Sequence, residues 1–175
     1  MAATDPVQAH LDSLAPLLVQ GSPHAVALGF ELVSLSVERA VMRAPYREDL
    51  VGDPATGVLH GGVVTALLDH ASGLAAFAGL GGNDATATLD LRLDYMRPAE
   101  PGRDVIAEAR PVKAAGLFAF VHAIAHDGDP DDPVATASAA FMVTRASQAA
   151  AERARGAMKA RATPISKLPD LGAEE

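Results

Sequence analysis

The chain has 175 residues, enough for one domain with a hydrophobic core, and its 49% hydrophobic content is typical of a globular protein. Acidic residues outnumber basic ones by 22 to 14, and the net charge of −8 argues against general binding to nucleic acid. The sequence contains no cysteine, which excludes disulfides, thiolate catalysis and cysteine-ligated zinc.

Residues 1–24 predict a short helical extension. Asp5 and Pro6 are the residue types of a helix N-cap and first helical position, and leucines follow at helical spacing at positions 11, 14, 17 and 18. Residues 21–23, Gly-Ser-Pro, end this helix. The first residues have neither the basic nor the apolar region of a signal peptide, so we expect a cytoplasmic protein.

The hydrophobic pattern changes to a period of two at Phe30, which begins the next predicted element. Residues 30–35 and 40–46 both alternate in this way, and together they predict a β-hairpin. A charged loop with glycine and proline, residues 47–54, follows the hairpin.

The longest apolar segment, residues 60–78, predicts the helix around which the fold is organised. One side of it carries small and polar residues: Gly62, Thr65, Asp69, Ser72, Gly73 and Ala76. Neither side has the lysines and glutamates of a solvated helix, so we expect both sides to be buried. The polar residues and glycines argue against a membrane span.

Asp69 is a carboxylate within this apolar helix. Burying an ionised carboxylate without partners is costly, so a buried aspartate has either a structural partner or a chemical task. The structural interpretation is a bond to a neighbouring hydroxyl or backbone donor. The chemical interpretation is favoured by the small side chains of Gly62, Thr65, Ser72 and Gly73, which leave room for a substrate to approach Asp69.

Gly61 and Gly62 expose backbone N–H groups at the positive end of the helix, a position suited to an anion or a developing oxyanion. Gly61 and Asp69 are eight residues apart, about 12 Å along the helix axis. An oxyanion donor and a general base must each lie about 3 Å from the reacting centre, so one helix cannot supply both. Two helices packed antiparallel can, which predicts a homodimer.

Glycines at positions 79, 81 and 82 end the helix, and four strands are predicted to follow, over residues 88–95, 103–113, 117–126 and 134–145. In the first strand Leu89, Leu91, Leu93 and Tyr95 alternate with Thr88, Asp90, Arg92 and Asp94, which places Thr88 on the hydrophilic face. No βαβ pattern occurs, so we expect an α+β fold with an antiparallel sheet wrapped around one long central helix. Alanines at positions 135, 137 and 139 suit close packing of the helix on the sheet. The sheet domain would span residues 25–145, and a C-terminal helix and tail would occupy residues 146–175.

Two other kinds of site are disfavoured by spacing. The histidines at positions 60, 70, 122 and 126 lack the helical spacing of a metal site, so we expect no metal. Asp69, His70 and Ser72 cannot form a catalytic triad, because adjacent side chains diverge on a helix and no Gly-x-Ser-x-Gly turn is present.

Two motifs resemble those of the hotdog-fold acyl-CoA thioesterases. The first is Thr56-Gly57-Val58-Leu59-His60-Gly61-Gly62, with Asp69 nine residues after the histidine, and the second is Tyr95-Met96-Arg97-Pro98. They are most similar to the branch named after the phenylacetate-degradation thioesterase, and the resemblance covers residues 30–145. It implies a hotdog fold, an acyl-CoA substrate, no cofactor, and homodimers that pair again into a dimer of dimers.

The resemblance also implies roles for individual residues. The N–H of Gly61 would donate to the thioester carbonyl, and His60 matches the histidine of the family motif. Asp69 from the facing subunit would act as general base or as nucleophile. Thr88 aligns with a hydroxyl that holds the attacking water in some members.

The chain departs from the family pattern at two places. Asp53 is the polar residue nearest to the position of a family asparagine, with spacing that differs by one residue, and we include it among the candidates for substrate binding. Ala115-Gly116 stands where many relatives have Gly-Lys, so a cation that could meet a coenzyme A phosphate is missing there. A non-catalytic module that binds or senses acyl-CoA is the alternative function, and the acyl group stays open.

Overall fold

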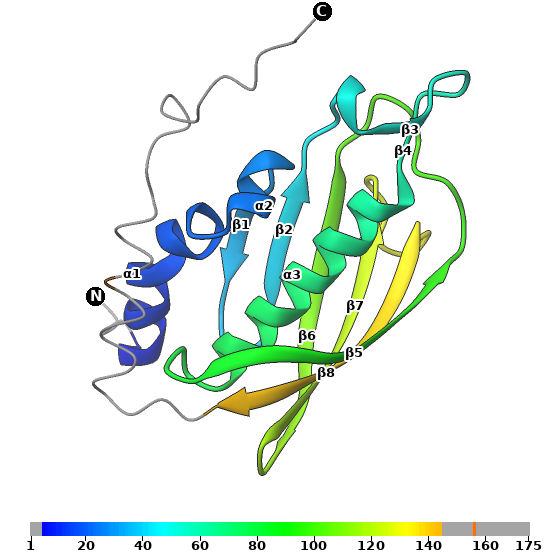
Figure 1. The fold of residues 1–175 in the computed structure, drawn as a ribbon. Helices are drawn as coiled ribbons and strands as arrows, with labels where there is room; N and C mark the ends of the chain where they lie inside the picture. The colour runs from blue at the N-terminus through cyan, green and yellow to red at the C-terminus, as the bar shows by residue number, and fades with distance from the viewer. Residues whose placement is uncertain (1–4, 145–155, 157–175) are drawn as a thin grey trace, which may run out of the picture.

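The computed structural model describes residues 5–144 and residue 156. Over these residues an antiparallel sheet curves behind one long helix (Figure 1). The elements in chain order are α1 (Pro6–Gln20), α2 (Pro23–Ala27), β1 (Glu31–Leu35), β2 (Ala40–Ala44), the 3-10 helix η1 (Glu48–Leu50), β3 (Val51–Asp53), β4 (Val58–Leu59), α3 (Gly61–Gly79), β5 (Ala85–Tyr95), β6 (Val105–Ala115), β7 (Phe118–His126) and β8 (Ala135–Thr144). The predicted α+β class and central helix are confirmed.

The main sheet has six strands in the order β1-β2-β6-β7-β8-β5, and every neighbouring pair is antiparallel. The predicted hairpin corresponds to β1 and β2, and the four later predicted strands correspond to β5–β8. β3 and β4 form a separate two-stranded ribbon before α3. β3 lies in the segment 47–54 that the sequence predicted as a loop, and the sequence did not predict β4 or α2.

The concave face of the sheet is made of small side chains where α3 packs against it. Alternate residues of β6, β7 and β8 are buried on this face: Val105, Ala107, Ala109, Ala119, Val121, Ala123, Ala125, Ala135, Ala137 and Ala139. Their short side chains let α3 approach the sheet closely, and Leu67, Leu68 and Ala71 of α3 are fully buried there. The predicted role of the alanines at 135, 137 and 139 is confirmed.

α1 packs beside β1 and near the end of α3 (Figure 1). Asp5 accepts the N–H of Val7, so the predicted N-cap is confirmed. The ring of His10 bonds the carbonyl of Gly82 at 3.1 Å. Gly82 has a φ of +75°, and a Cβ there would lie 2.8 Å from Leu11, so both the backbone and the packing require glycine.

By length and composition alone, α3 is long and apolar enough to cross a membrane. A buried core helix has the same character, and 56% of this segment is already buried inside the chain. The C-terminal helix expected within residues 146–175 lies outside the described residues, apart from residue 156, and the three-part division of the chain stays a prediction.

Candidate active site

The N-terminus of α3 consists of His60, Gly61 and Gly62, and all three are exposed. His60 is the N-cap, and its Nδ1 accepts the N–H of Gly62 at 2.9 Å. Because Nδ1 is the acceptor, the ring proton belongs on Nε2. Among the described residues the N–H of Gly61 has no hydrogen-bond partner, so it is a free donor at the positive end of the helix.

The last residue of η1 and the strand β3 that follows it fix the position of His60. The N–H of His60 donates to the carbonyl of Leu50 at 2.9 Å. A Cβ on Gly52 would lie 2.9 Å from the Cα of His60, closer than real Cβ atoms approach. Glycine at position 52 therefore lets the two segments lie against each other.

Asp53 lies at the turn of the β3–β4 ribbon. Its carboxylate accepts the N–H of Ala55 at 3.0 Å and the hydroxyl of Thr56 at 3.1 Å. These bonds are typical of an aspartate that shapes a turn. The contact of Asp53 with substrate stays a prediction.

Tyr95, the last residue of β5, reaches the first turn of α3. Its hydroxyl donates to the carbonyl of Gly61 at 2.5 Å and lies 2.7 Å from the hydroxyl of Thr65. Thr65 also donates to the Gly61 carbonyl, at 3.1 Å. The sequence identified Tyr95 only as part of a motif and gave no signal for this contact, which joins residues 34 positions apart.

Asp69 is half buried two turns into α3. Its Oδ1 accepts the hydroxyl of Thr88 at 3.0 Å. The structure therefore brings together two residues that the sequence selected separately. Their catalytic roles stay predictions, because a hydroxyl partner is also what the structural interpretation of Asp69 required.

Thr88 reaches Asp69 because β5 contains a bulge. The register with β8 shifts between Thr88 and Asp90, so Leu89 is an extra residue without a partner. Strict alternation would place Thr88 on the same outer face as Asp90, whereas the bulge sets it opposite buried Phe141 on the face toward α3. The prediction that Thr88 lies on the hydrophilic face of the strand is wrong for this reason.

The polar side of α3 is only partly covered. Gly61 and Gly62 are exposed, and Thr65, Asp69 and Gly73 are half buried. The expectation that both sides of the helix are buried is therefore wrong within one chain, because the sheet packs on the other side. An open polar side leaves Asp69 accessible to a ligand or to a second chain.

Ser72 differs from its neighbours on this side. It is fully buried, and its hydroxyl has no hydrogen-bond partner among the described residues. At Gly73 an added Cβ would lie 3.6 Å from the ring of Phe141, in ordinary contact. Substrate contacts of Ser72 and Gly73 stay predictions.

A cavity of about 350 Å³ adjoins the N-terminus of α3. Its lining is mostly apolar: Val58, Leu59, Gly61, Val64, Tyr95, Met96, Arg97, Pro98, Ala99 and Val134. A larger cavity of about 460 Å³ lies between α1 and β1, but neither Gly61 nor Asp69 lines it. The smaller cavity is therefore the one associated with the candidate site, and its lining suits an apolar ligand group.

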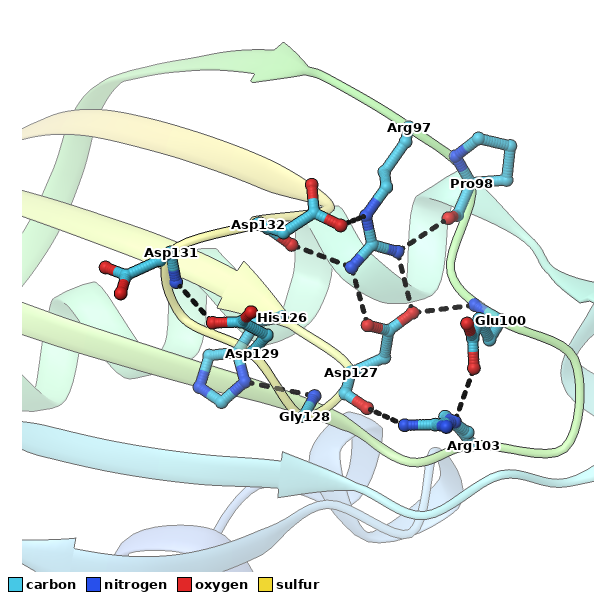
Figure 2. Close-up of polar contacts among 10 residues, drawn as sticks. All are labelled: Arg97, Pro98, Glu100, Arg103, His126, Asp127, Gly128, Asp129, Asp131 and Asp132. Carbon is cyan, nitrogen blue, oxygen red and sulfur yellow. Dashed lines mark hydrogen bonds and ion pairs between the residues drawn. The ribbon is translucent and has the colours of Figure 1, made fainter.

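Arg97 lines this cavity and is held by acidic residues of the β7–β8 loop (Figure 2). Its guanidinium donates to both oxygens of Asp127, at 2.7 and 2.8 Å, and pairs with Asp132 at 2.9 Å. The hydrogen bonds from Arg97 hold the pKa of buried Asp127 well below its usual range, and those to Asp127 raise the pKa of Arg97. Asp127 also accepts the N–H of Glu100 at 2.7 Å, so the β5–β6 and β7–β8 loops are joined.

His70 follows Asp69 in the sequence but takes no part in the contact between Asp69 and Thr88. Burial lowers the pKa of the His70 ring. The carbonyl of Leu18 and the carboxylate of Asp69 raise this pKa by a smaller amount, so the ring is neutral at pH 7. Within the described part of the chain, no group of three or more His, Asp or Glu side chains gathers to hold a metal ion.

Comparisons with known proteins agree on one family. Residues 56–134 match the family model described as Thioesterase superfamily. A candidate esterase of Halobacterium salinarum is 34% identical over 127 residues, which are 67% of this chain and 82% of the relative. The medium/long-chain acyl-CoA thioesterase YigI of Escherichia coli is 28% identical over 156 residues, which are 82% of this chain and 99% of YigI.

A solved structure gives the same answer for the fold. A mutant of the phenylacetic acid degradation protein PaaI from Thermus thermophilus is 28% identical, with a TM-score of 0.61 over 69% of this chain and 98% of that one. The sheet around α3, the family match over the His60 motif and the 34% identical relative together show that the chain belongs to the thioesterase superfamily of hotdog-fold hydrolases.

Proposed function

We propose that the protein hydrolyses an acyl-CoA thioester to a free acid and coenzyme A. The observation that carries this proposal is the free N–H of Gly61 at the positive end of α3, beside an apolar cavity. A backbone donor in this position stabilises the oxyanion that forms when a thioester carbonyl is attacked.

Asp69 supplies the second catalytic group. As a general base it takes a proton from water while the water oxygen bonds to the thioester carbon; the C–S bond then breaks, and the thiolate of coenzyme A leaves and takes up a proton. As a nucleophile, a carboxylate oxygen attacks the carbon itself and expels the thiolate, and water then cleaves the mixed anhydride. The hydroxyl of Thr88, which donates to Oδ1 at 3.0 Å, is proposed to orient the water in either route.

The active site is proposed to form between two chains. Gly61 and Asp69 belong to the same helix, about 12 Å apart along its axis, so one chain cannot present both to one carbon. The open polar side of α3 and the unpaired edge of β5 provide the surface for a homodimer, where Leu89 in β5 is 53% exposed and Met96, just after β5, is 59% exposed. The family resemblance further implies that two such homodimers associate into a dimer of dimers.

The acyl group is proposed to be a medium or long aliphatic chain. The apolar lining of the cavity beside Gly61 favours a hydrocarbon group. YigI, which matches along nearly its whole length, is named for medium- and long-chain acyl-CoA.

A panel of short-, medium-, long-chain and aryl acyl-CoAs, with a thiol reagent to detect released coenzyme A, tests this function. We expect turnover that is highest for medium or long chains. Asp69→Asn, which keeps the shape and removes the base, should lower kcat by about 10³-fold or more while acyl-CoA still binds. Tight binding without turnover by the unaltered protein would favour the non-catalytic binding module, and near-normal turnover by Asp69→Asn would remove Asp69 from the mechanism.

A further inference from the structure

The first two residues of α3, Gly61 and Gly62, have no side chains with which to hold their position. Glycine has the widest choice of backbone angles of any residue. If Gly61 is the oxyanion donor, the direction of its N–H has to be fixed by groups outside these two residues. The described residues provide three such groups: His60 at the N–H of Gly62, and the hydroxyls of Tyr95 and Thr65 at the carbonyl of Gly61.

His60 and Tyr95 fix different backbone atoms of the two glycines. The His60 ring accepts the N–H of Gly62, which removes that N–H from competition for the substrate. The Tyr95 hydroxyl donates to the Gly61 carbonyl, on the opposite side of the residue from its free N–H. With Gly62 N–H and Gly61 carbonyl both engaged, the peptide that joins the two glycines is held at both polar atoms.

The glycines and these two side chains fit each other closely. A Cβ on Gly61 would lie 3.4 Å from the Tyr95 hydroxyl, and a Cβ on Gly62 would lie 2.8 Å from the Nδ1 of His60. Glycine at position 62 thus admits the His60 ring, whereas a Cβ at position 61 would make only ordinary contact with the Tyr95 hydroxyl. Tyr95 also lines the cavity beside Gly61, so its ring and its hydroxyl serve separate purposes.

We propose that Tyr95 is a positioning residue that aims the N–H of Gly61 through its hydrogen bond to the Gly61 carbonyl. This inference rests on the proposed function of Gly61. Tyr95 transfers no proton, because its hydroxyl proton is committed to a backbone carbonyl. Its effect follows from geometry, since displacing a catalytic donor by about 1 Å can cost up to about 100-fold in rate.

Tyr95→Phe is the test variant, because it removes the hydroxyl and keeps the ring that lines the cavity. The chain has two tyrosines, and Tyr46→Phe is a matched control: the Tyr46 hydroxyl donates to the carbonyl of Gly57 at 3.0 Å in the segment before α3. Each variant loses one hydroxyl-to-carbonyl bond, and Tyr95→Phe also loses the contact with the hydroxyl of Thr65. Both should lower Tm by a similar amount, about 2–4 °C.

The two variants should differ in kinetics. We expect Tyr95→Phe to lower kcat by about 10- to 100-fold with KM for acyl-CoA nearly unchanged, and Tyr46→Phe to keep both constants. Light scattering confirms that the variants are compared in the same oligomeric state. An unchanged kcat in Tyr95→Phe, or an equal loss in Tyr46→Phe, overturns the proposal.

A second measurement does not depend on turnover. Amide hydrogen exchange followed by NMR should show faster exchange of the Gly62 and Val63 N–H groups in Tyr95→Phe and not in Tyr46→Phe, because the first turn has lost an anchor. If the unaltered protein hydrolyses no thioester and exchange still accelerates, the proposed function fails while the anchoring of Gly61 stands. Exchange that is equal in both variants and in the unaltered protein overturns the anchoring itself.

Discussion

A single hydrogen bond joins Thr88 to Asp69, and its purpose can be either structural or catalytic. Thr88 is exposed and Asp69 is only half buried, so losing this bond leaves no fully buried polar group unsatisfied and should cost little stability. A catalytic hydroxyl would instead affect the rate. The two roles therefore predict different outcomes for the same substitution.

Thr88→Val removes the hydroxyl and preserves the size and β-branching of the side chain. If Thr88 holds the attacking water, kcat should fall by about 10-fold, while KM and Tm stay nearly unchanged. Thr86→Val is a matched control, because Thr86 lies two residues earlier, opposite buried Val143 on the same face of β5. Equal kcat in the two variants would assign Thr88 a structural role.

Pre-steady-state kinetics of Thr88→Val also separate the two mechanisms of Asp69. With Asp69 as nucleophile, only hydrolysis of the covalent intermediate should slow, and rapid quenching should show a burst of free coenzyme A. With Asp69 as general base, release of coenzyme A should slow from the first turnover, without a burst.

The sequence predicted residues of the candidate site that lie close together along the chain. Gly61 and Asp69 belong to one helix, so spacing alone was enough to relate them, whereas His60 was identified by its match to the family motif. Other contacts join residues far apart in the sequence: Tyr95 bonds Gly61 across 34 residues, and Arg97 bonds Asp127 across 30. A pattern along the sequence does not reveal such contacts. The site was predictable where it follows helix periodicity and unpredictable where it depends on tertiary packing.

At the scale of elements, β5 also has features that a sequence pattern predicts and one that it does not. Its existence and its end at Tyr95 could be predicted from alternating residues, because an inner and an outer face recur with a period of two, but its start at Ala85 lies three residues before the predicted one. The bulge at Leu89 could not, since an extra residue changes the face without changing the composition. The main sheet and α3 were predictable from hydrophobic pattern, whereas the β3–β4 ribbon was not, because its strands have only three and two residues.

The ion pair between the β5–β6 and β7–β8 loops predicts a pH dependence of stability. The pKa of Asp127 is lowered in the folded state, so the pair contributes its full stability above the ordinary aspartate pKa of about 3.9 and loses it as pH falls further. Asp127→Asn should lower the free energy of unfolding at pH 7 by about 2–3 kcal/mol, because it weakens the bonds to Arg97.

Urea unfolding measured between pH 7 and pH 2 checks this prediction. The unaltered protein should lose more stability below pH 4 than Asp127→Asn does, so the two curves should converge in acid. Asp131→Asn is the control, since it removes the same charge from an exposed position in the same loop. Curves for the unaltered protein and Asp127→Asn that stay parallel down to pH 2 would show that the ion pair does not govern acid stability.

At the scale of the whole molecule, the site shared between chains can be tested by removing its two halves separately. Gly61→Pro removes the N–H at the first position of α3, where proline is well tolerated. The preceding residue, His60, already has the extended angles that proline favours before it, with φ −61° and ψ 134°. The variant should therefore fold and lose about 10²- to 10³-fold in kcat, while Gly61→Ala, which keeps the N–H, should stay active.

Mixing Gly61→Pro with Asp69→Asn then distinguishes a site within one chain from a site between two. In a mixed assembly, an intact Gly61 from the Asp69→Asn chain can face an intact Asp69 from the Gly61→Pro chain. Random assembly of equal amounts should make about a quarter of all sites complete, whether the protein is a dimer or a dimer of dimers. Co-unfolding and refolding the two inactive variants together should therefore restore about a quarter of the normal turnover. The same treatment of either variant alone should restore none, and a mixture no more active than its parents would mean that each site is built from a single chain.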